Sequence, residues 1–216
     1  MGSSKRRLIR LVQATQQQAK LLKMTGDFAL PARTGETLLQ IARRANHCTL
    51  CGLHKGRTKG VFGEGNPKAK LMFIGEAPGK EEDLTGRPFV GEAGQLLTKI
   101  ISAIGLARQE VYITNVVKCR PPDNRVPLPG EILSCQPYLV AQVEWVHPKI
   151  ICTLGKTATL SLLKTEEPIS KLRGRWFDFQ GIKVMPTFHP AYLLRNPSEK
   201  KLVWEDMKKI QQALLS

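Results

Sequence analysis

The sequence lacks any apolar run long enough to cross a bilayer. A spanning helix needs about 20 apolar residues, whereas the run Ile150–Leu154 has five. The N-terminal region is basic, but it has no apolar stretch before small residues of the kind that precede a secretory cleavage site. Gly2 lacks the Ser or Thr at position 6 that myristoylation favours, because Arg6 stands there. These absences predict a soluble cytoplasmic protein with no membrane partner.

Acidic residues are scarce. The chain has 18 Asp and Glu against 33 Lys and Arg, a formal net charge of +15, and residues 1–47 alone hold nine basic and two acidic residues. Lys and Arg that neutralise phosphates release condensed counterions, so a surplus of this size favours a polyanion such as nucleic acid. An anionic membrane surface and a merely basic exterior are alternatives that composition leaves open.

Cysteines are few, and the five present argue for a metal or reactive thiols before disulfides in a cytoplasmic chain. Cys48 and Cys51 form a C-x2-C pair, whereas Cys119 and Cys135 lie too far apart for a second tight pair. Zinc sites usually draw on two tight pairs, so this spacing counts against zinc without excluding it. Cys152 lies inside an apolar run, which predicts a buried thiol.

Strand-like and helical patterns alternate from Lys70 onward. Apolar residues at helical spacing predict helices over 93–104, 129–146 and 156–163 and after Pro197. Segments rich in β-formers predict strands over 70–74, 111–117, 150–154 and 182–187, and 172–179 resembles a further strand that turns into the last one. This alternation predicts a three-layer α/β/α fold with a central, mainly parallel four-stranded sheet.

Residues 1–44 are expected to form a basic N-terminal helical extension. Within it, residues 4–23 suit an amphipathic helix, and a polar break through Gly26–Gly35 separates them from a second helix at about 36–46. Residues 45–216 would then form the functional domain. The extension is a possible contact for DNA or for a replication or repair partner.

Unusual polar segments follow three of the four predicted strands. Gly75–Gly79 follows the first strand, Asn115 lies in the second, and Phe188–Pro197 follows the fourth. Ligands of open parallel sheets bind beyond the carboxyl ends of the strands. We therefore expect carboxylates, an amide and an imidazole to converge at one edge of the sheet.

Phosphate-binding loops are the usual alternative at such an edge, and the sequence does not support them. Gly75–Lys80 is one residue short of a Walker loop, and no Ser or Thr follows its Lys. Gly155-Lys156-Thr157 has the right ending, but the required earlier glycine falls on Ile150. Nucleotide hydrolysis is therefore unsupported.

Four segments in this order resemble the motifs of the family 4 uracil-DNA glycosylases: Gly75–Gly79, Arg87–Gly91, Ile113–Pro122 and His189–Pro197. The cysteine spacing also fits that family, and the likeness covers roughly residues 45–215. The resemblance implies a monomeric, prokaryotic-type enzyme beside the nucleoid that flips uracil out of single- or double-stranded DNA and hydrolyses its bond to the sugar, leaving an abasic site. It also implies a 4Fe–4S cluster on Cys48, Cys51, Cys119 and Cys135.

Cleavage of this bond develops positive charge on the sugar and negative charge on the departing uracil. His189 is expected to donate a hydrogen bond to the uracil 2-carbonyl, and Phe89 to stack on the flipped base. Asn115 offers a donor and an acceptor, which suit the carbonyl and imide N–H of uracil. Cytosine reverses that pattern and would leave buried groups unpaired.

Glu76 and Glu82 are the candidate carboxylates for holding water and supporting the cationic sugar. Better-known family 1 enzymes supply a water-activating Asp where this chain has Ala77, so which carboxylate positions water stays open. The resemblance also suggests that Glu82 excludes the methyl group of thymine. The uracil pocket is thus expected to comprise Glu76, Ala77, Pro78, Glu82, Phe89, Asn115 and His189.

Leu193, Leu194 and Arg195 follow His189 on what we expect to be an exposed loop. An apolar wedge there would fill the space left by the flipped base, with Arg195 on a phosphate; alternatively, the leucines dock the loop on the core.

Two other functions compete with the enzyme. One is a relative that captures the sugar covalently through a His on a basic insertion, although Lys118–Cys135 contains no His. The other is a non-catalytic redox or DNA-binding module, which the full set of pocket residues disfavours.

Overall fold

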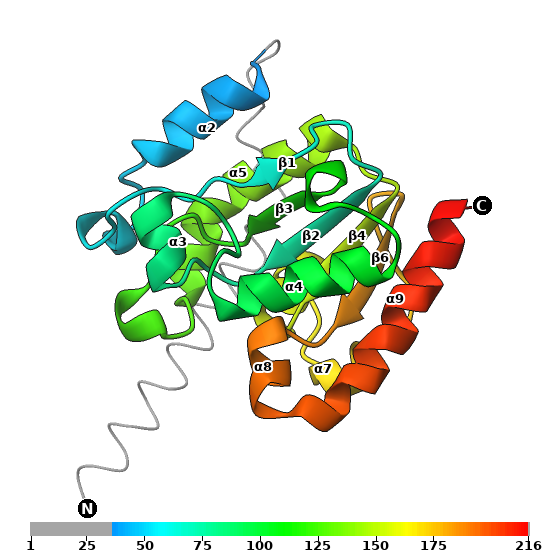
Figure 1. Ribbon diagram of the computed structural model, residues 1–216. Helices are drawn as coiled ribbons and strands as arrows, with labels where there is room; N and C mark the ends of the chain where they lie inside the picture. The colour runs from blue at the N-terminus through cyan, green and yellow to red at the C-terminus, as the bar shows by residue number, and fades with distance from the viewer. Residues whose placement is uncertain (1–35, 216) are drawn as a thin grey trace, which may run out of the picture. The chain divides into compact units, whose positions relative to one another are not determined.

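Four short apolar runs form the parallel centre of a six-stranded sheet in the computed structural model, which describes residues 36–215 (Figure 1). The strand order is β1-β3-β2-β4-β6-β5; the inner four strands run parallel, and the two edge strands run antiparallel to their neighbours. The strands are β1 (Glu64–Gly65), β2 (Leu71–Gly75), β3 (Tyr112–Asn115), β4 (Ile150–Leu154), β5 (Phe177–Phe179) and β6 (Ile182–Thr187).

Helices cover both faces of the sheet, with α4 and α9 in front of it and α5 behind it in Figure 1. The α-helices are α2 (Leu38–Asn46), α3 (Lys80–Thr85), α4 (Glu92–Ala103), α5 (Pro129–Val146), α6 (Lys156–Leu163), α7 (Ile169–Leu172), α8 (Pro190–Arg195) and α9 (Lys200–Leu215). Short 3-10 helices lie at Gly52–Lys55, Arg108–Glu110, Pro122–Asn124 and Pro197–Glu199.

Alternate residues of each inner strand enter two separate cores, because successive side chains of a strand point to opposite faces. Met72 and Ile74 of β2 pack with α2, α5 and α6, whereas Leu71 and Phe73 pack with α4, α8 and α9. All five residues of β2 and of β4 are buried, as expected for strands covered on both faces. The predicted three-layer α/β/α fold is confirmed.

The sheet is wider than the four strands we predicted. The four predicted strands form its centre, and β1 and β5 extend it at the edges. The segment 172–179 is a strand only over its last three residues. Its first residue, Leu172, is the last residue of helix α7. Leu172 is 2% exposed, and burial in the core holds this turn of helix in place.

The described residues belong to one compact unit that begins at Glu36, and the domain boundary at residue 44 stays a prediction. Helix α2 belongs to this unit because Ile41 and Ala45 are buried in the core that contains Tyr138 of α5. Most of the predicted extension, including the amphipathic helix expected over 4–23, lies outside the described residues. Within residues 36–215, none of the helices combines the length and the apolar character that crossing a membrane requires.

Candidate active site

Asn115 lies at the carboxyl end of β3, directly beside Gly75 at the end of β2. Its side chain is buried, and its Oδ1 has no hydrogen-bond partner among the described residues. A Cβ added at Gly75 would lie 2.4 Å from Asn115 Oδ1 and 2.4 Å from Phe89 Cζ, so only glycine allows both side chains to close over this strand end. A buried polar atom without a partner costs about 1–3 kcal/mol. The amide is therefore poised for a ligand that donates a hydrogen bond.

His189 follows β6 and faces the same point. Its ring centroid lies 5.7 Å from that of Phe89. Gly155, at the end of β4, has a φ of 87°, and a Cβ there would lie 2.9 Å from His189 Cβ. Residues from the ends of β3 and β6, Asn115 and His189, therefore both lie close to Phe89, which comes from the segment between α3 and α4.

The protonation state of His189 follows from its surroundings. Its Nδ1 accepts a hydrogen bond of 3.1 Å from the backbone N–H of Ala191, at the start of α8. Burial lowers the pKa of His189 to about 4, and the nearby cation of Arg195 acts in the same direction. The ring is thus neutral at physiological pH, and with Nδ1 accepting, its proton lies on Nε2. His189 is a neutral hydrogen-bond donor.

Glu82, one of the two candidate carboxylates, binds backbone N–H groups with both of its oxygens. Its Oε1 accepts hydrogen bonds from the backbone N–H groups of Val90 (2.8 Å) and Gly91 (3.0 Å), and its Oε2 accepts one from Gly79 (3.0 Å). Both oxygens therefore bind backbone and join the start of α3 to the segment that carries Phe89.

Glu76 is half-buried after β2, and its Oε2 accepts a short hydrogen bond from Thr157 Oγ1 in the first turn of α6. Its Oε1 accepts no hydrogen bond from the described residues. Ala77 and Pro78 continue the same loop, half-buried and buried respectively. Sequence reasoning missed Thr157, although it lies in the Gly155-Lys156-Thr157 segment that we rejected as a phosphate loop.

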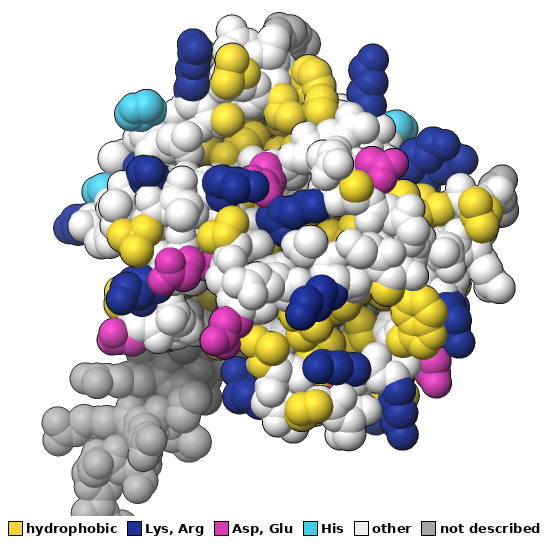
Figure 2. Space-filling view, viewed as in Figure 1, with side chains coloured by type: hydrophobic (Ala, Val, Ile, Leu, Met, Phe, Trp, Pro, Cys, Tyr) yellow, Lys and Arg dark blue, Asp and Glu magenta, His cyan; other side chains and the backbone are white. Residues whose placement is uncertain are grey.

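The segment after His189 is helix α8, not the exposed loop that we expected. Leu193 is 1% exposed and packs in the core with α4 and α9, so it cannot act as a wedge in this structure. Leu194 is 41% exposed and Arg195 is also exposed. Helical geometry separates the two leucines, because adjacent residues point in different directions. Lys and Arg side chains are spread over the whole face shown in Figure 2.

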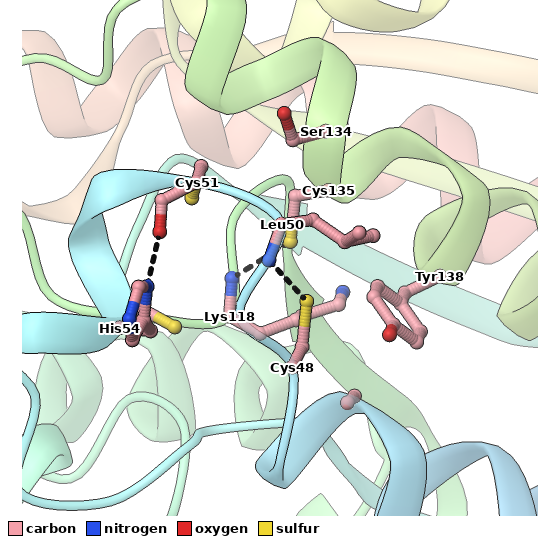
Figure 3. A pocket seen from close by; sticks show the side chains of 10 residues that line it. Cys48, Leu50, Cys51, His54, Lys118, Ser134, Cys135 and Tyr138 are labelled. Atoms are coloured by element: carbon pink, nitrogen blue, oxygen red, sulfur yellow. Dashed lines mark hydrogen bonds between the residues drawn. The ribbon is translucent and has the colours of Figure 1, made fainter.

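Four of the five cysteines line one pocket: Cys48, Cys51, Cys119 and Cys135 (Figure 3). N–H groups point at three of the sulfur atoms: Leu50 N lies 3.5 Å from Cys48 Sγ, Arg57 Nη1 lies 3.1 Å from Cys119 Sγ, and Lys118 N lies 3.3 Å from Cys135 Sγ. Such donors stabilise thiolates that ligate metal. Cys152 is fully buried in β4, as predicted.

Burial disfavours the charged form of these thiols. It raises the pKa of Cys135 to about 12 and also raises the pKa values of Cys51 and Cys119, while Arg57 and Lys118 oppose the shifts at Cys119 and Cys135. Metal ligation requires thiolates. Within residues 36–215, no three His, Cys, Asp or Glu side chains are grouped tightly enough to share a single metal ion.

Comparison with known proteins decides the family. The model of the uracil DNA glycosylase superfamily matches residues 62–208. The chain belongs to the uracil DNA glycosylase superfamily. The matched region contains the ends of all four inner strands, so it includes Asn115, Phe89 and His189.

Relatives within the superfamily confirm the resemblance to family 4. The chain is 50% identical over 185 residues to a type-4 uracil-DNA glycosylase of Saccharolobus solfataricus, an alignment that covers 82% of this chain and 86% of the relative. It is 49% identical over 181 residues to the type-4 enzyme of Thermotoga maritima, covering 82% and 94%. A type-5 uracil-DNA glycosylase of Pyrobaculum aerophilum is more distant, at 32% over 146 residues, covering 60% and 64%.

Proposed function

We propose that this member of the superfamily excises uracil from DNA by hydrolysing the N-glycosidic bond, with a pocket built on Asn115, Phe89 and His189. The observation that carries the proposal is a buried amide oxygen, on Asn115, that has no partner among residues 36–215 and lies near Phe89, beside which the neutral imidazole donor of His189 also lies. The family and the type-4 relatives assign uracil excision. The geometry supports a role for each side chain.

Asn115 selects the base. Its Oδ1 accepts the imide N–H of uracil, and its Nδ2 donates to the adjacent carbonyl. Cytosine has an acceptor nitrogen and a donor amino group at these positions, so it would leave two buried groups unpaired, and rejection of that kind is strong. Phe89 provides the stacking surface for the flipped base.

His189 stabilises the leaving group. Negative charge grows on the uracil 2-carbonyl as the bond breaks, and a fixed donor at that point lowers the barrier. A neutral imidazole suits this task, because its Nε2–H donates a hydrogen bond to the uracil oxygen while the proton stays on the ring. Glu76, whose Oε1 is free of hydrogen bonds from the described residues, holds the water and supports the cationic sugar, while Thr157 orients the other oxygen. Glu82 acts by fixing the segment that carries Phe89.

The cysteine pocket suits a 4Fe–4S cluster. Such a cluster is held by four thiolates, and Cys48, Cys51, Cys119 and Cys135 line this one pocket. The hydrogen-bond donors on three of the sulfurs suit this role. When bound, the cluster would hold the segment before β1 to the segment after β3.

DNA contact extends from the pocket along α8. Exposed Leu194 is the residue that can fill the space left by the base, and Arg195 can contact a phosphate. The net charge of +15 supplies general attraction to the backbone. We further propose that the protein acts as a monomer in the cytoplasm, at the nucleoid, and that the basic residues before Glu36 contact DNA or a repair partner.

One assay tests the function. The purified chain is incubated with an oligonucleotide that contains one uracil and with a matched strand that contains thymine, and alkali-sensitive breaks are measured over many turnovers. We expect breaks at uracil alone, with free uracil released. A heat-stable protein–DNA adduct in stoichiometric yield would favour the covalent trap. Binding without any cleavage would favour the non-catalytic module.

A further inference from the structure

Lys118 is a fully buried lysine that the proposed chemistry does not use. Its side chain is among the largest of the fully buried ones, and its Nζ donates hydrogen bonds to Asn115 O (2.5 Å) and Thr114 Oγ1 (2.8 Å). The ammonium also lies 5.9 Å from the centre of the Phe62 ring. Within residues 36–215, no carboxylate forms an ion pair with it. A buried charge without a counter-charge is strongly unfavourable.

Cysteine sulfurs of the proposed cluster site lie next to Lys118. Its backbone N–H donates to Cys135 Sγ at 3.3 Å, and Cys119 is the next residue in the chain. Both cysteines would become negatively charged on ligating metal as thiolates. Lys118 and the four cysteines line the same pocket (Figure 3). Four thiolates on a 4Fe–4S core would carry a net charge of about −2. That charge would supply the missing compensation.

The same side chain reaches the uracil pocket. Asn115, whose backbone oxygen accepts the hydrogen bond from the ammonium, also has a buried side-chain oxygen with no partner among the described residues. Thr114, the other acceptor, is buried and donates to the backbone oxygen of Phe62, which Gln142 also contacts. The peptide that carries Asn115 is thus held on the side of the cysteine pocket by a hydrogen bond from a charged donor, which is stronger than a bond between neutral groups.

We infer that Lys118 is a positioning residue that links the cysteine cluster to uracil recognition: the negative charge of the cysteine site retains the ammonium, and the ammonium fixes the Asn115 peptide so that its amide faces the base. The inference rests on the proposed function and adds to it. The cysteine site would then support the pocket electrostatically as well as holding two segments together.

Arg57 provides a matched control. It is also a cation at the cysteine pocket, since its Nη1 donates to Cys119 Sγ. Its other contact, from Nη2 to Asn46 O, lies at the end of α2 and not at Asn115. Replacing Arg57 therefore removes positive charge beside the sulfurs without touching the uracil pocket.

The experiment compares Lys118→Met and Arg57→Met in the iron-loaded protein. Iron content, the visible absorbance and the midpoint potential of the cluster report on the cysteine site, and NMR titration with free uracil reports on the pocket. Both variants should shift the potential to more negative values, because each removes a cation beside the sulfurs. Only Lys118→Met should weaken uracil binding, by about tenfold, the equivalent of one lost hydrogen bond to a charged group.

The contact of Lys118 with Asn115 and its electrostatic contact with the cluster are tested by different measurements. Normal uracil affinity in Lys118→Met with full iron content would overturn the link to Asn115, and an unchanged midpoint potential would overturn the electrostatic contact with the cluster. If Lys118→Met does not fold, Lys118→Gln, which keeps a polar head, carries the same test. Wild-type cleavage of uracil-containing DNA is measured on the same preparation, and its absence would refute the proposed function instead.

Discussion

The ring of Phe89 lies 5.7 Å from the imidazole of His189, centroid to centroid, with an interplanar angle of 33°. Phe89 reaches this position with a φ of 52°, a left-handed conformation that non-glycine residues rarely adopt. Its neighbours hold it there: Glu82 accepts the N–H groups of Val90 and Gly91, and Arg108 donates to Pro88 O. A strained residue held in this way is typical of a preorganised binding site.

Replacing Phe89 with Ala should therefore weaken uracil binding by tenfold or more, because stacking of a base on an aromatic ring is worth about 1–3 kcal/mol. Affinity for free uracil, measured by NMR titration, checks this. Phe179→Ala on edge strand β5 is the matched control and should bind uracil normally. Equal affinity in Phe89→Ala and wild type would remove Phe89 from the uracil pocket.

Asn115→Ala and His189→Ala should each lower the single-turnover rate of uracil release by about a hundredfold or more, as loss of a charge-stabilising donor does. His189→Gln is informative because its amide keeps a donor. We expect it to retain more activity than His189→Ala. If the Gln and Ala variants are equally slow, hydrogen-bond donation is not the role of His189.

The protonation of His189 sets how the rate of uracil release should depend on pH. The neutral ring is the donor, and its pKa is lowered to about 4 by burial and by Arg195. The single-turnover rate should therefore hold as pH falls from 7 and decline only near about pH 4. Arg195→Gln removes a cation that lowers this pKa, so its decline should begin at higher pH. Rates measured across the pH range in both proteins check the shift, and identical profiles would contradict it.

The same shift predicts how stability changes with pH. Above the ordinary His value of 6.5, the ring is neutral in both the folded and the unfolded chain, and its contribution is complete. Between 6.5 and about 4, the unfolded chain binds the proton first, so the free energy of unfolding falls as pH falls. In His189→Gln, this part of the fall in the free energy of unfolding with falling pH should be missing. Denaturant titrations at several pH values can measure the difference.

Glu82→Gln tests the role of the carboxylate that holds the pocket wall. An amide has one acceptor oxygen, so it cannot accept all three backbone N–H groups that Glu82 binds. We expect weaker uracil binding and slower excision, with no release of thymine from a thymine-containing strand. Thymine release by this variant would instead restore the role of Glu82 as a barrier to the methyl group.

Much of the fold could be predicted because its signals are local. Helices α5 and α6 and strands β4 and β6 have the predicted bounds, since apolar periodicity and flanking Pro and Gly mark them. The convergence of Asn115 and His189 followed from one topological rule about the ends of parallel strands. Strand β1 was missed because two residues, Glu64 and Gly65, carry no periodic pattern.

The rest depends on tertiary contacts that no local pattern reports. Leu193 and Leu194 are adjacent and chemically identical, and only the packing of α8 against α4 decides which one is buried. The backbone contacts of Glu82 are not visible in the local sequence, because its partner Val90 lies eight residues away. Nothing in the sequence around Lys118 indicates that its side chain is buried and donates to Asn115 O.

Cys135→Ser and Cys152→Ser test the cysteine assignment as a matched pair, since both thiols are buried and only Cys135 lines the cysteine pocket. Wild-type protein prepared without oxygen should be brown and carry about four irons and four sulfides per chain. Cys135→Ser should lose colour and iron and unfold at lower temperature, because a ligand that joins distant segments is lost. Cys152→Ser should keep its colour and iron, although its buried hydroxyl will lower stability. Iron and sulfide analysis with thermal melts of the three proteins decides the matter. A colourless wild-type protein loaded with zinc, or a Cys135→Ser variant with full iron content, would contradict the assignment.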